Sequence, residues 1–193
     1  LFALNDPLRF VTWGMAERTL WHALLAATGV ALVLRTPLVT AGRVLGWLAL
    51  AHFATFPLLL HNPLWSAQAV GALPVLNLLL PAYAVATALV LWLRPAIMPR
   101  WVPDATAMLL LAVGALSLLR QAFSGTLLLQ PLGGGEDLLR SLLAIALALA
   151  YLAWGARTGQ RSWRVGSLVL MLGAVLKVFV LDAAALDGLA RIG

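Results

Sequence analysis

The stretch that decides the fold is Trp163–Gly193, WRVGSLVLMLGAVLKVFVLDAAALDGLARIG. Its segment from Val165 to Leu181 is long and apolar enough for a membrane-spanning helix, which needs about 20 such residues. Lys177 lies inside this segment and is the only lysine among the 13 lysine and arginine residues of the chain. An ionisable side chain at this depth is costly unless it is paired, faces a polar cavity or reaches an interface. The stretch therefore predicts a transmembrane helix with a polar partner or exit for Lys177.

Two interpretations of Lys177 remain open. The ammonium either snorkels to the membrane interface or joins a polar cluster between helices. In the second case we expect its partner on another span, Glu136 included, or in the segment 182–191. Helical spacing also places Gly173 on the lysine face, and small residues allow helices to approach closely. We therefore expect Gly173 to lie at a helix–helix contact.

The composition excludes most other classes of protein. The chain has 193 residues, of which 63% are hydrophobic and only 10% are charged, so most of it must face lipid. The net charge is +6, but the arginines are scattered singly between apolar runs, which excludes a nucleic-acid-binding patch. The absence of cysteine excludes disulfides and thiolate metal sites. No cofactor or metal is implied.

The predicted fold is all-α, a polytopic transmembrane helical bundle that occupies residues 1–193 as a single domain. Six apolar segments predict six spans, at about 17–35, 43–60, 71–93, 104–120, 137–155 and 163–182. The third span contains Pro74 and Pro81, and each proline removes a backbone hydrogen bond. We therefore expect a bent or interrupted helix there.

The loop charges predict the orientation. One set of loops carries only a single acid, Asp104, against the arginines at positions 35, 43, 94, 100, 157, 161 and 164. On the opposite side, acids and arginines nearly balance. The positive-inside rule places the first set in the cytoplasm and both ends of the segment outside it. This arrangement predicts a multi-pass membrane protein.

Two polar residues are expected within spans. His52 lies halfway along the second span, where we expect a neutral side chain hydrogen-bonded to a neighbouring helix, with a proton relay as the alternative. Asn77 lies between the two prolines, where its amide can satisfy freed backbone groups. Interrupted helices also hold transporter substrates, so ligand binding is the alternative for Asn77. His22 is expected at the interface.

Charged residues are predicted to gather around Lys177 at the outer ends of the last three spans. Glu136 and Arg140 have the spacing of an ion pair at the start of the fifth span. The preceding glycines, 133–135, indicate a hinge, because the lysine and hydroxyl residue of a phosphate loop do not follow them. The cluster is a candidate site or an ordinary charged membrane rim, and it comprises Lys177, Asp182, Glu136, Arg120, Arg140, Asp187 and Arg191.

The second half of the chain carries a characteristic order of short motifs. They are Arg120-x-x-Phe123-x-Gly125, then Glu136 and Ser141, then Arg164-x-Gly166, then Lys177-Val-Phe179-Val-Leu-Asp182, then Leu186-x-Gly188-Leu-x-Arg191. This order, over about residues 115–193, resembles the bacterial membrane-protein family catalogued as domain of unknown function 2339. The resemblance implies a large inner-membrane protein with many helices, of which this chain is a fragment. It implies no activity.

Three functions are compatible with these features. The first is a structural or interaction role in the inner membrane, with the lipid bilayer and further transmembrane helices as partners. The second is transport or ligand handling at Asn77, His52 and Lys177. The third is an enzyme for an envelope or lipid-linked substrate, with Glu136 or Asp182 at an outer cleft. No catalytic motif is present in the sequence, which favours the first function.

Overall fold

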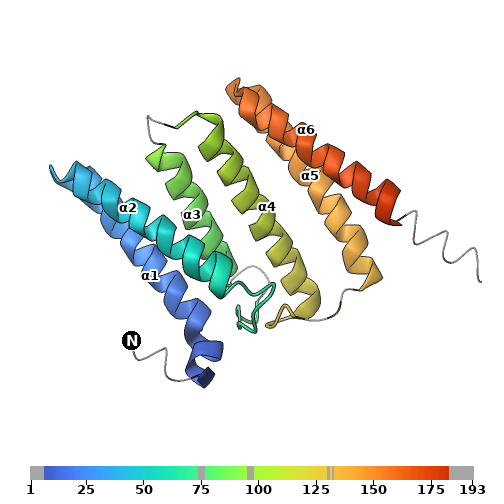
Figure 1. Cartoon of the computed structure of the whole chain (residues 1–193), viewed down its shortest axis with the longest axis horizontal. Helices are drawn as coiled ribbons and strands as arrows, with labels where there is room; N and C mark the ends of the chain where they lie inside the picture. The colour runs from blue at the N-terminus through green and yellow to red at the C-terminus, as the bar shows by residue number, and fades with distance from the viewer. Residues whose placement is uncertain (1–6, 74–76, 95–97, 130, 132, 183–193) are drawn as a thin grey trace, which may run out of the picture. The chain divides into compact units, whose positions relative to one another are not determined.

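The computed structural model describes residues 7–73, 77–94, 98–129, 131 and 133–182 (Figure 1). Every regular element in these residues is a helix, which confirms the predicted all-α class. The helices are α1 (Pro7–Arg35), α2 (Val39–Phe53), α3 (Leu79–Leu93), α4 (Trp101–Ser124), α5 (Gly134–Thr158) and α6 (Arg161–Leu176). Two of them continue as π-helical turns, α2 into η2 (Ala54–Leu60) and α6 into η3 (Lys177–Asp182). The chain divides into two compact units, Leu1–Pro131 and Leu132–Gly193.

The membrane character of the helices agrees with the sequence, although not every predicted span is equally long. Four helical segments of the described chain are long and apolar enough to cross a membrane: Val39–Leu60, Trp101–Ser124, Gly135–Thr158 and Arg161–Phe179. The helix of the predicted third span, α3, has only 15 residues. The predicted first span lies within the 29 residues of α1. The structure thus supports a multi-pass protein, and the count of six spans remains a prediction.

The third span begins later than the sequence predicts. The described residues between Gly71 and Leu78 are not helical, and α3 starts at Leu79. Pro81 therefore lies in the first turn of α3, where a missing backbone N–H costs little. The helix of the predicted third span therefore starts only after these non-helical residues. By contrast, Pro57 lies inside η2, and the backbone there adopts π-helical turns.

The first unit is organised by pairs of neighbouring helices. Figure 1 shows α1 beside α2 and α3 beside α4, and both pairs are in contact. The closest approach joins α1 and α2: a Cβ atom added to Gly42 would lie 2.5 Å from the carbonyl oxygen of Gly29. Around this pair the buried core includes Phe53 of α2, Tyr83 of α3 and Leu110 of α4. Phe53 and Tyr83 meet edge to face, with ring centroids 5.4 Å apart.

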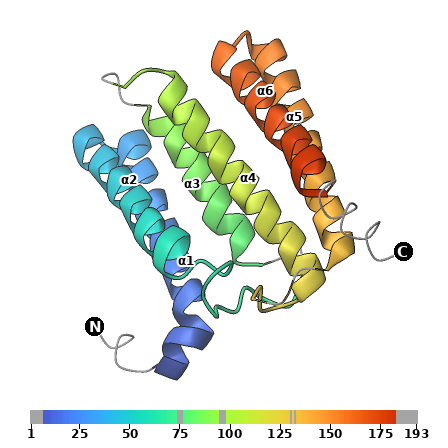
Figure 2. The same cartoon turned by 45° about the vertical axis from the view of Figure 1, so that its right-hand side comes forward.

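The second unit is a hairpin of α5 and α6 (Figure 2). The helices approach most closely near their connecting turn, where a Cβ atom on Gly155 would lie 2.9 Å from the backbone nitrogen of Arg164. Trp163 is buried there, with its ring edge to face with Tyr151 at 5.5 Å. The turn itself closes at Gly159, whose φ of 69° lies in the left-handed region that glycine adopts without strain.

The expectation that Gly173 lies at a helix contact is wrong. Gly173 is exposed, and no atom of the described structure lies within 4 Å of a Cβ built on it. The buried side of α6 contains Trp163, Ser167 and Ala174 instead. A helical face extends from Lys177 through both the third and the fourth preceding residue. Ala174, three residues before Lys177, is buried. Gly173, four residues before it, lies exposed at the edge of this face.

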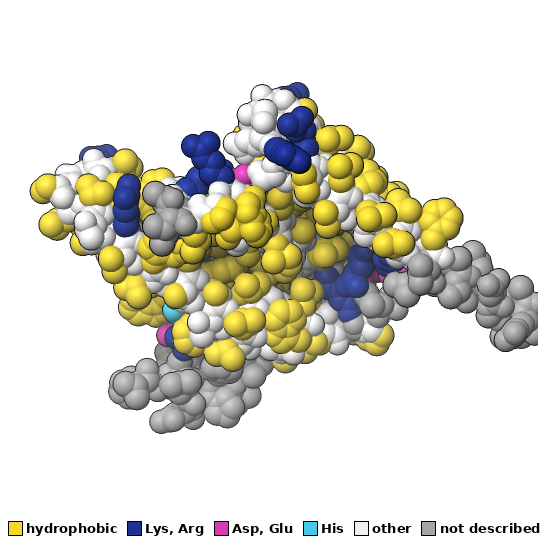
Figure 3. Space-filling model, turned by 45° about the horizontal axis from the view of Figure 1, so that its top comes forward, with side chains coloured by type: hydrophobic (Ala, Val, Ile, Leu, Met, Phe, Trp, Pro, Cys, Tyr) yellow, Lys and Arg dark blue, Asp and Glu magenta, His cyan; other side chains and the backbone are white. Residues whose placement is uncertain are grey.

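The outer surface of the helices is strongly apolar. Figure 3 shows hydrophobic side chains over most of the visible face. Phe179 is 73% exposed and Leu34 is 70% exposed, and both are large side chains that water would solvate poorly. Such surfaces on helices of this length are expected to contact lipid.

Candidate functional site

Lys177 is paired with the first turns of α5. Its Nζ donates hydrogen bonds to Asp137 Oδ2 at 2.9 Å and to Ser141 Oγ at 3.0 Å. The expected partner on another span is therefore present, and snorkelling alone does not describe this lysine. The partner is Asp137, the neighbour of the expected Glu136. The side chains of Lys177 and Asp137 are 27% and 42% exposed, so this ion pair lies at the surface of the hairpin.

A second ion pair lies beside the first. Arg140 Nη2 is 3.0 Å from Glu136 Oε1, which confirms the predicted pair at the start of α5. The Glu136 side chain is only 2% exposed, so it is not presented to open solvent. The described structure therefore brings Lys177, Glu136 and Arg140 together on one end of the hairpin, along with Asp137 and Ser141.

The hydrogen bonds of Lys177 favour a structural role, in which it joins α6 to α5, over a catalytic pair with Ser141. A serine nucleophile needs a neighbouring base that accepts its proton. An ammonium has three donors and no acceptor, and that of Lys177 donates to both Asp137 and Ser141. In this ion pair Lys177 cannot take the proton of Ser141.

The remaining members of the predicted cluster are Arg120, Asp182, Asp187 and Arg191. Arg120 belongs to α4 in the first unit, where it is 5% exposed and donates from Nε to the carbonyl oxygen of Leu128 at 2.9 Å. Asp182 is the last residue of η3, and its side chain lies outside the described part of the structure. Asp187 and Arg191 also lie outside the described residues.

Two histidines, His22 and His52, join α1 to α2. A ring nitrogen of His52, Nε2, lies 3.2 Å from the carbonyl oxygen of Arg18, as expected for a histidine bonded to a neighbouring helix. His22 is fully buried, with Nδ1 3.0 Å from the carbonyl oxygen of Ala49, and its place at the membrane interface remains a prediction. Each helix thus offers a backbone carbonyl to a histidine of the other. His22 is buried because α2 packs over this side of α1.

Arg18 and His61 both pack against the ring of Phe56 in η2. The Arg18 guanidinium lies over the Phe56 ring, with its carbon 4.5 Å from the ring centroid. His61, in the loop directly after η2, is 2% exposed and lies 5.9 Å from the same ring. Burial and the positive charge of Arg18 lower the pKa of His61 below its ordinary value of 6.5. His61 therefore stays neutral at neutral pH. The sequence alone does not indicate this group, because Arg18 lies far from Phe56 and His61 in the chain.

Buried amides hold the non-helical segment before α3. Asn77 accepts a hydrogen bond from the backbone nitrogen of Leu80 at 3.0 Å, which is the predicted satisfaction of a free backbone group. Its amide nitrogen donates to Gln121 Oε1. Gln121 is 1% exposed, and its own Nε2 donates to the carbonyl oxygens of Gly71 at 2.8 Å and Leu73 at 3.3 Å. Non-helical backbone at membrane depth requires partners of this kind.

Two further amides complete this arrangement. Asn62, which is fully buried, donates from Nδ2 to the Tyr83 hydroxyl at 3.2 Å. The side-chain oxygen of Gln68 accepts from the backbone nitrogen of Met15 at 3.1 Å. Asn62, Gln68 and Gln121 were not among the candidate polar residues expected from the sequence. An amide at the end of an apolar run is the signal for Asn62 and Gln121, and an amide between two alanines is the signal for Gln68.

The connection between α3 and α4 is closed by an ion pair. Arg94 Nη2 donates to Asp104 Oδ1 at 2.8 Å, and the Asp104 side chain is only 4% exposed. Asp104 is the single acid among the loops predicted to face the cytoplasm. Its charge is therefore matched by a local arginine.

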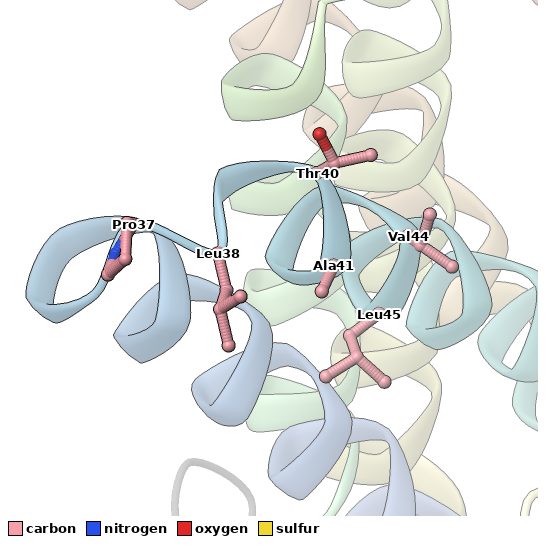
Figure 4. Close-up of a pocket in the computed structure, with 6 residues that line it drawn as sticks. All are labelled: Pro37, Leu38, Thr40, Ala41, Val44 and Leu45. Atoms are coloured by element: carbon pink, nitrogen blue, oxygen red, sulfur yellow. The ribbon is translucent and has the colours of Figure 1, made fainter.

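A surface depression lies at the turn between α1 and α2 (Figure 4). Thr40 is its only polar side chain, and the other lining residues are apolar: Pro37, Leu38, Ala41, Val44 and Leu45. No carboxylate, histidine or lysine side chain lines this depression, so no neighbouring base is present in its lining to activate the Thr40 hydroxyl. Among the residues that the structure describes, no group of three or more His, Asp or Glu side chains could hold a metal ion.

Comparison with known proteins identifies one similarity. A family model described as "Predicted membrane protein (DUF2339)" matches residues 3–193. This match agrees with the resemblance seen in the motifs of about residues 115–193, and it also covers the N-terminal helices. No curated protein and no solved structure matches the chain.

Proposed function

The chain belongs to the DUF2339 family of predicted membrane proteins, and from this premise we propose that it has a structural role in a bacterial inner membrane. In this proposal it is one transmembrane domain of a longer protein, and its polar side chains join neighbouring helices. Its partners are the lipid bilayer and further transmembrane helices of the same protein or complex.

The observation that supports this role most directly is where the polar side chains within the helices make their bonds. His52 bonds to the backbone of α1, and Lys177 bonds to two side chains of α5. Asn77 bonds to Gln121 of α4 and to the start of α3. Bonds of this kind hold helices together in a membrane, where an unsatisfied polar group is costly. A transporter would instead require these residues to line a path for water or substrate.

The proposed orientation places the α5–α6 turn in the cytoplasm and the loop before α5 outside it. The arginines of the α5–α6 turn support this orientation, because cytoplasmic loops carry an excess of Arg and Lys. The ends of the segment are then both non-cytoplasmic.

Labelling of single cysteines tests both the role and the orientation, because the natural chain has no cysteine. We expect Thr158→Cys to react with an impermeant thiol reagent only from the cytoplasmic side, and Gly133→Cys only from the opposite side. Both positions are exposed. We expect His52→Cys to react from neither side until the protein is unfolded. Reaction of His52→Cys in the folded protein would contradict the structural role and favour transport. Exchanged sides for Thr158→Cys and Gly133→Cys would reverse the orientation.

A further inference from the structure

The turn between α5 and α6 presents three arginines on a short stretch of chain. Arg157 lies in the last turn of α5, and Arg161 and Arg164 lie in the first turn of α6. All three are exposed. The sequence contains no Asp or Glu between Asp137 and Asp182, so the turn has no local acid to balance this charge. Among the described residues, none forms an ion pair with any of the three arginines.

Arg35, Arg43 and Arg100 also lack a described ion-pair partner, but they are divided between two connections, whereas the α5–α6 turn gathers three such arginines on one short stretch. Several other cationic residues of the described chain do have partners. Arg94 is paired with Asp104, Arg140 with Glu136, and Lys177 with Asp137. Arg120 is buried and bonded to a backbone carbonyl, and Arg18 is stacked on Phe56. Those cations have roles within the fold. The guanidinium groups of the α5–α6 turn remain available to a partner outside it.

The turn is also rigidly built. Gly155 allows the start of α6 to touch α5, with a would-be Cβ only 2.9 Å from the backbone of Arg164. The ring of Trp163 is buried against Tyr151 and lies 6.3 Å from that of Trp154. Trp154 itself is 53% exposed and lies three residues before Arg157, on the same side of α5. Exposed tryptophan is typical of the headgroup level of a bilayer.

We propose that the α5–α6 turn binds the phosphate of an anionic phospholipid headgroup. Guanidinium groups match phosphate oxygens with two parallel hydrogen bonds, and a fixed turn holds the three groups at low entropic cost. The exposed Trp154 ring places this site at the level of the phosphates, and the apolar faces of α5 and α6 below it would contact the acyl chains. This inference rests on the proposed membrane role, although the binding itself is independent of which side the turn faces.

The test compares lipid binding by the purified full chain in a zwitterionic detergent. Native mass spectrometry would measure binding of phosphatidylglycerol and of phosphatidylcholine to each variant. We expect the natural chain to prefer phosphatidylglycerol, and the variant Arg157→Gln/Arg161→Gln/Arg164→Gln to bind it about 100-fold more weakly at low salt. The variant Arg157→Lys/Arg161→Lys/Arg164→Lys keeps the charge but loses the paired hydrogen bonds. We expect its affinity for phosphatidylglycerol to be intermediate.

A matched control removes the same charge from the first unit. Arg35, Arg43 and Arg100 are exposed, and no described residue pairs with them, so Arg35→Gln/Arg43→Gln/Arg100→Gln should keep phosphatidylglycerol affinity within about threefold. The proposal would be overturned if both glutamine variants lost phosphatidylglycerol affinity equally. It would also be overturned if Arg157→Gln/Arg161→Gln/Arg164→Gln lost none. Glycerol phosphate, which carries the headgroup phosphate without acyl chains, should compete poorly. Competition as strong as that of the lipid would assign the site to soluble phosphates instead. The cysteine labelling above tests the proposed function separately, so the two can fail independently.

Discussion

Gly42→Leu is expected to lower the free energy of unfolding by about 3 kcal/mol or more. Even a Cβ atom at this position would lie 2.5 Å from the carbonyl oxygen of Gly29 and 2.6 Å from Cγ2 of Val33. The first of these atoms belongs to the backbone, so it cannot move aside as the end of a flexible side chain does. The two helices would have to separate, and the histidine bonds between them would be lost as well.

Gly173→Leu is the matched control, because it makes the same chemical change on a transmembrane helix. Nothing described lies within 4 Å of its Cβ position, so we expect a change of no more than about 0.5 kcal/mol. Unfolding of the purified protein in mixed micelles, followed by circular dichroism, would measure both variants. If Gly42→Leu and Gly173→Leu changed the free energy of unfolding equally, the α1–α2 contact at Gly42 would not be tightly packed.

Gln121→Leu is expected to cost about 2–4 kcal/mol. The substitution keeps the volume of the side chain near its natural value but removes its bonds to Asn77, to Gly71 and to Leu73. Because Gln121 is 1% exposed, water does not replace these bonds freely. The non-helical segment before α3 would lose its attachment to α4. Faster proteolysis or hydrogen exchange in residues 71–78 should accompany the loss of stability.

Gln160→Leu is the control for this change. Gln160 lies at the start of α6, and no described residue bonds to its buried side-chain oxygen. We therefore expect the same substitution there to be nearly neutral, within about 0.5 kcal/mol. If Gln121→Leu were equally neutral, the buried amides would not hold the segment before α3.

The helical class and the membrane character were predictable because they depend on composition and on the length of apolar runs. The contact partners were harder to predict, as the glycines show. Gly42 and Gly46 form a Gly-x-x-x-Gly pattern, which is a known signal for close helix approach. The expectation for Gly173 depended instead on its position beside Lys177. A single-helix pattern defines a face to within about one residue, and the neighbouring helix decides which edge of that face is buried.

The candidate site shows a similar limit. The need of Lys177 for a partner followed from the cost of a charge among apolar residues, and the ion pair of Glu136 and Arg140 followed from local spacing. The choice of Asp137 over Glu136 did not follow, because it depends on the rotation of α5 relative to α6. The cation–π contact of Arg18 with Phe56 depends in the same way on how α1 and η2 pack.

The central claim is that polar side chains within these helices join one helix to another, and a double-mutant cycle on Lys177 and Asp137 tests it most directly. The cycle compares the unfolding free energies of Lys177→Met, Asp137→Asn and the double variant with that of the natural chain. Because both side chains are partly exposed, the account predicts a modest coupling of about 0.5–1.5 kcal/mol. Single-variant effects that simply add, to within about 0.3 kcal/mol, would contradict the claim.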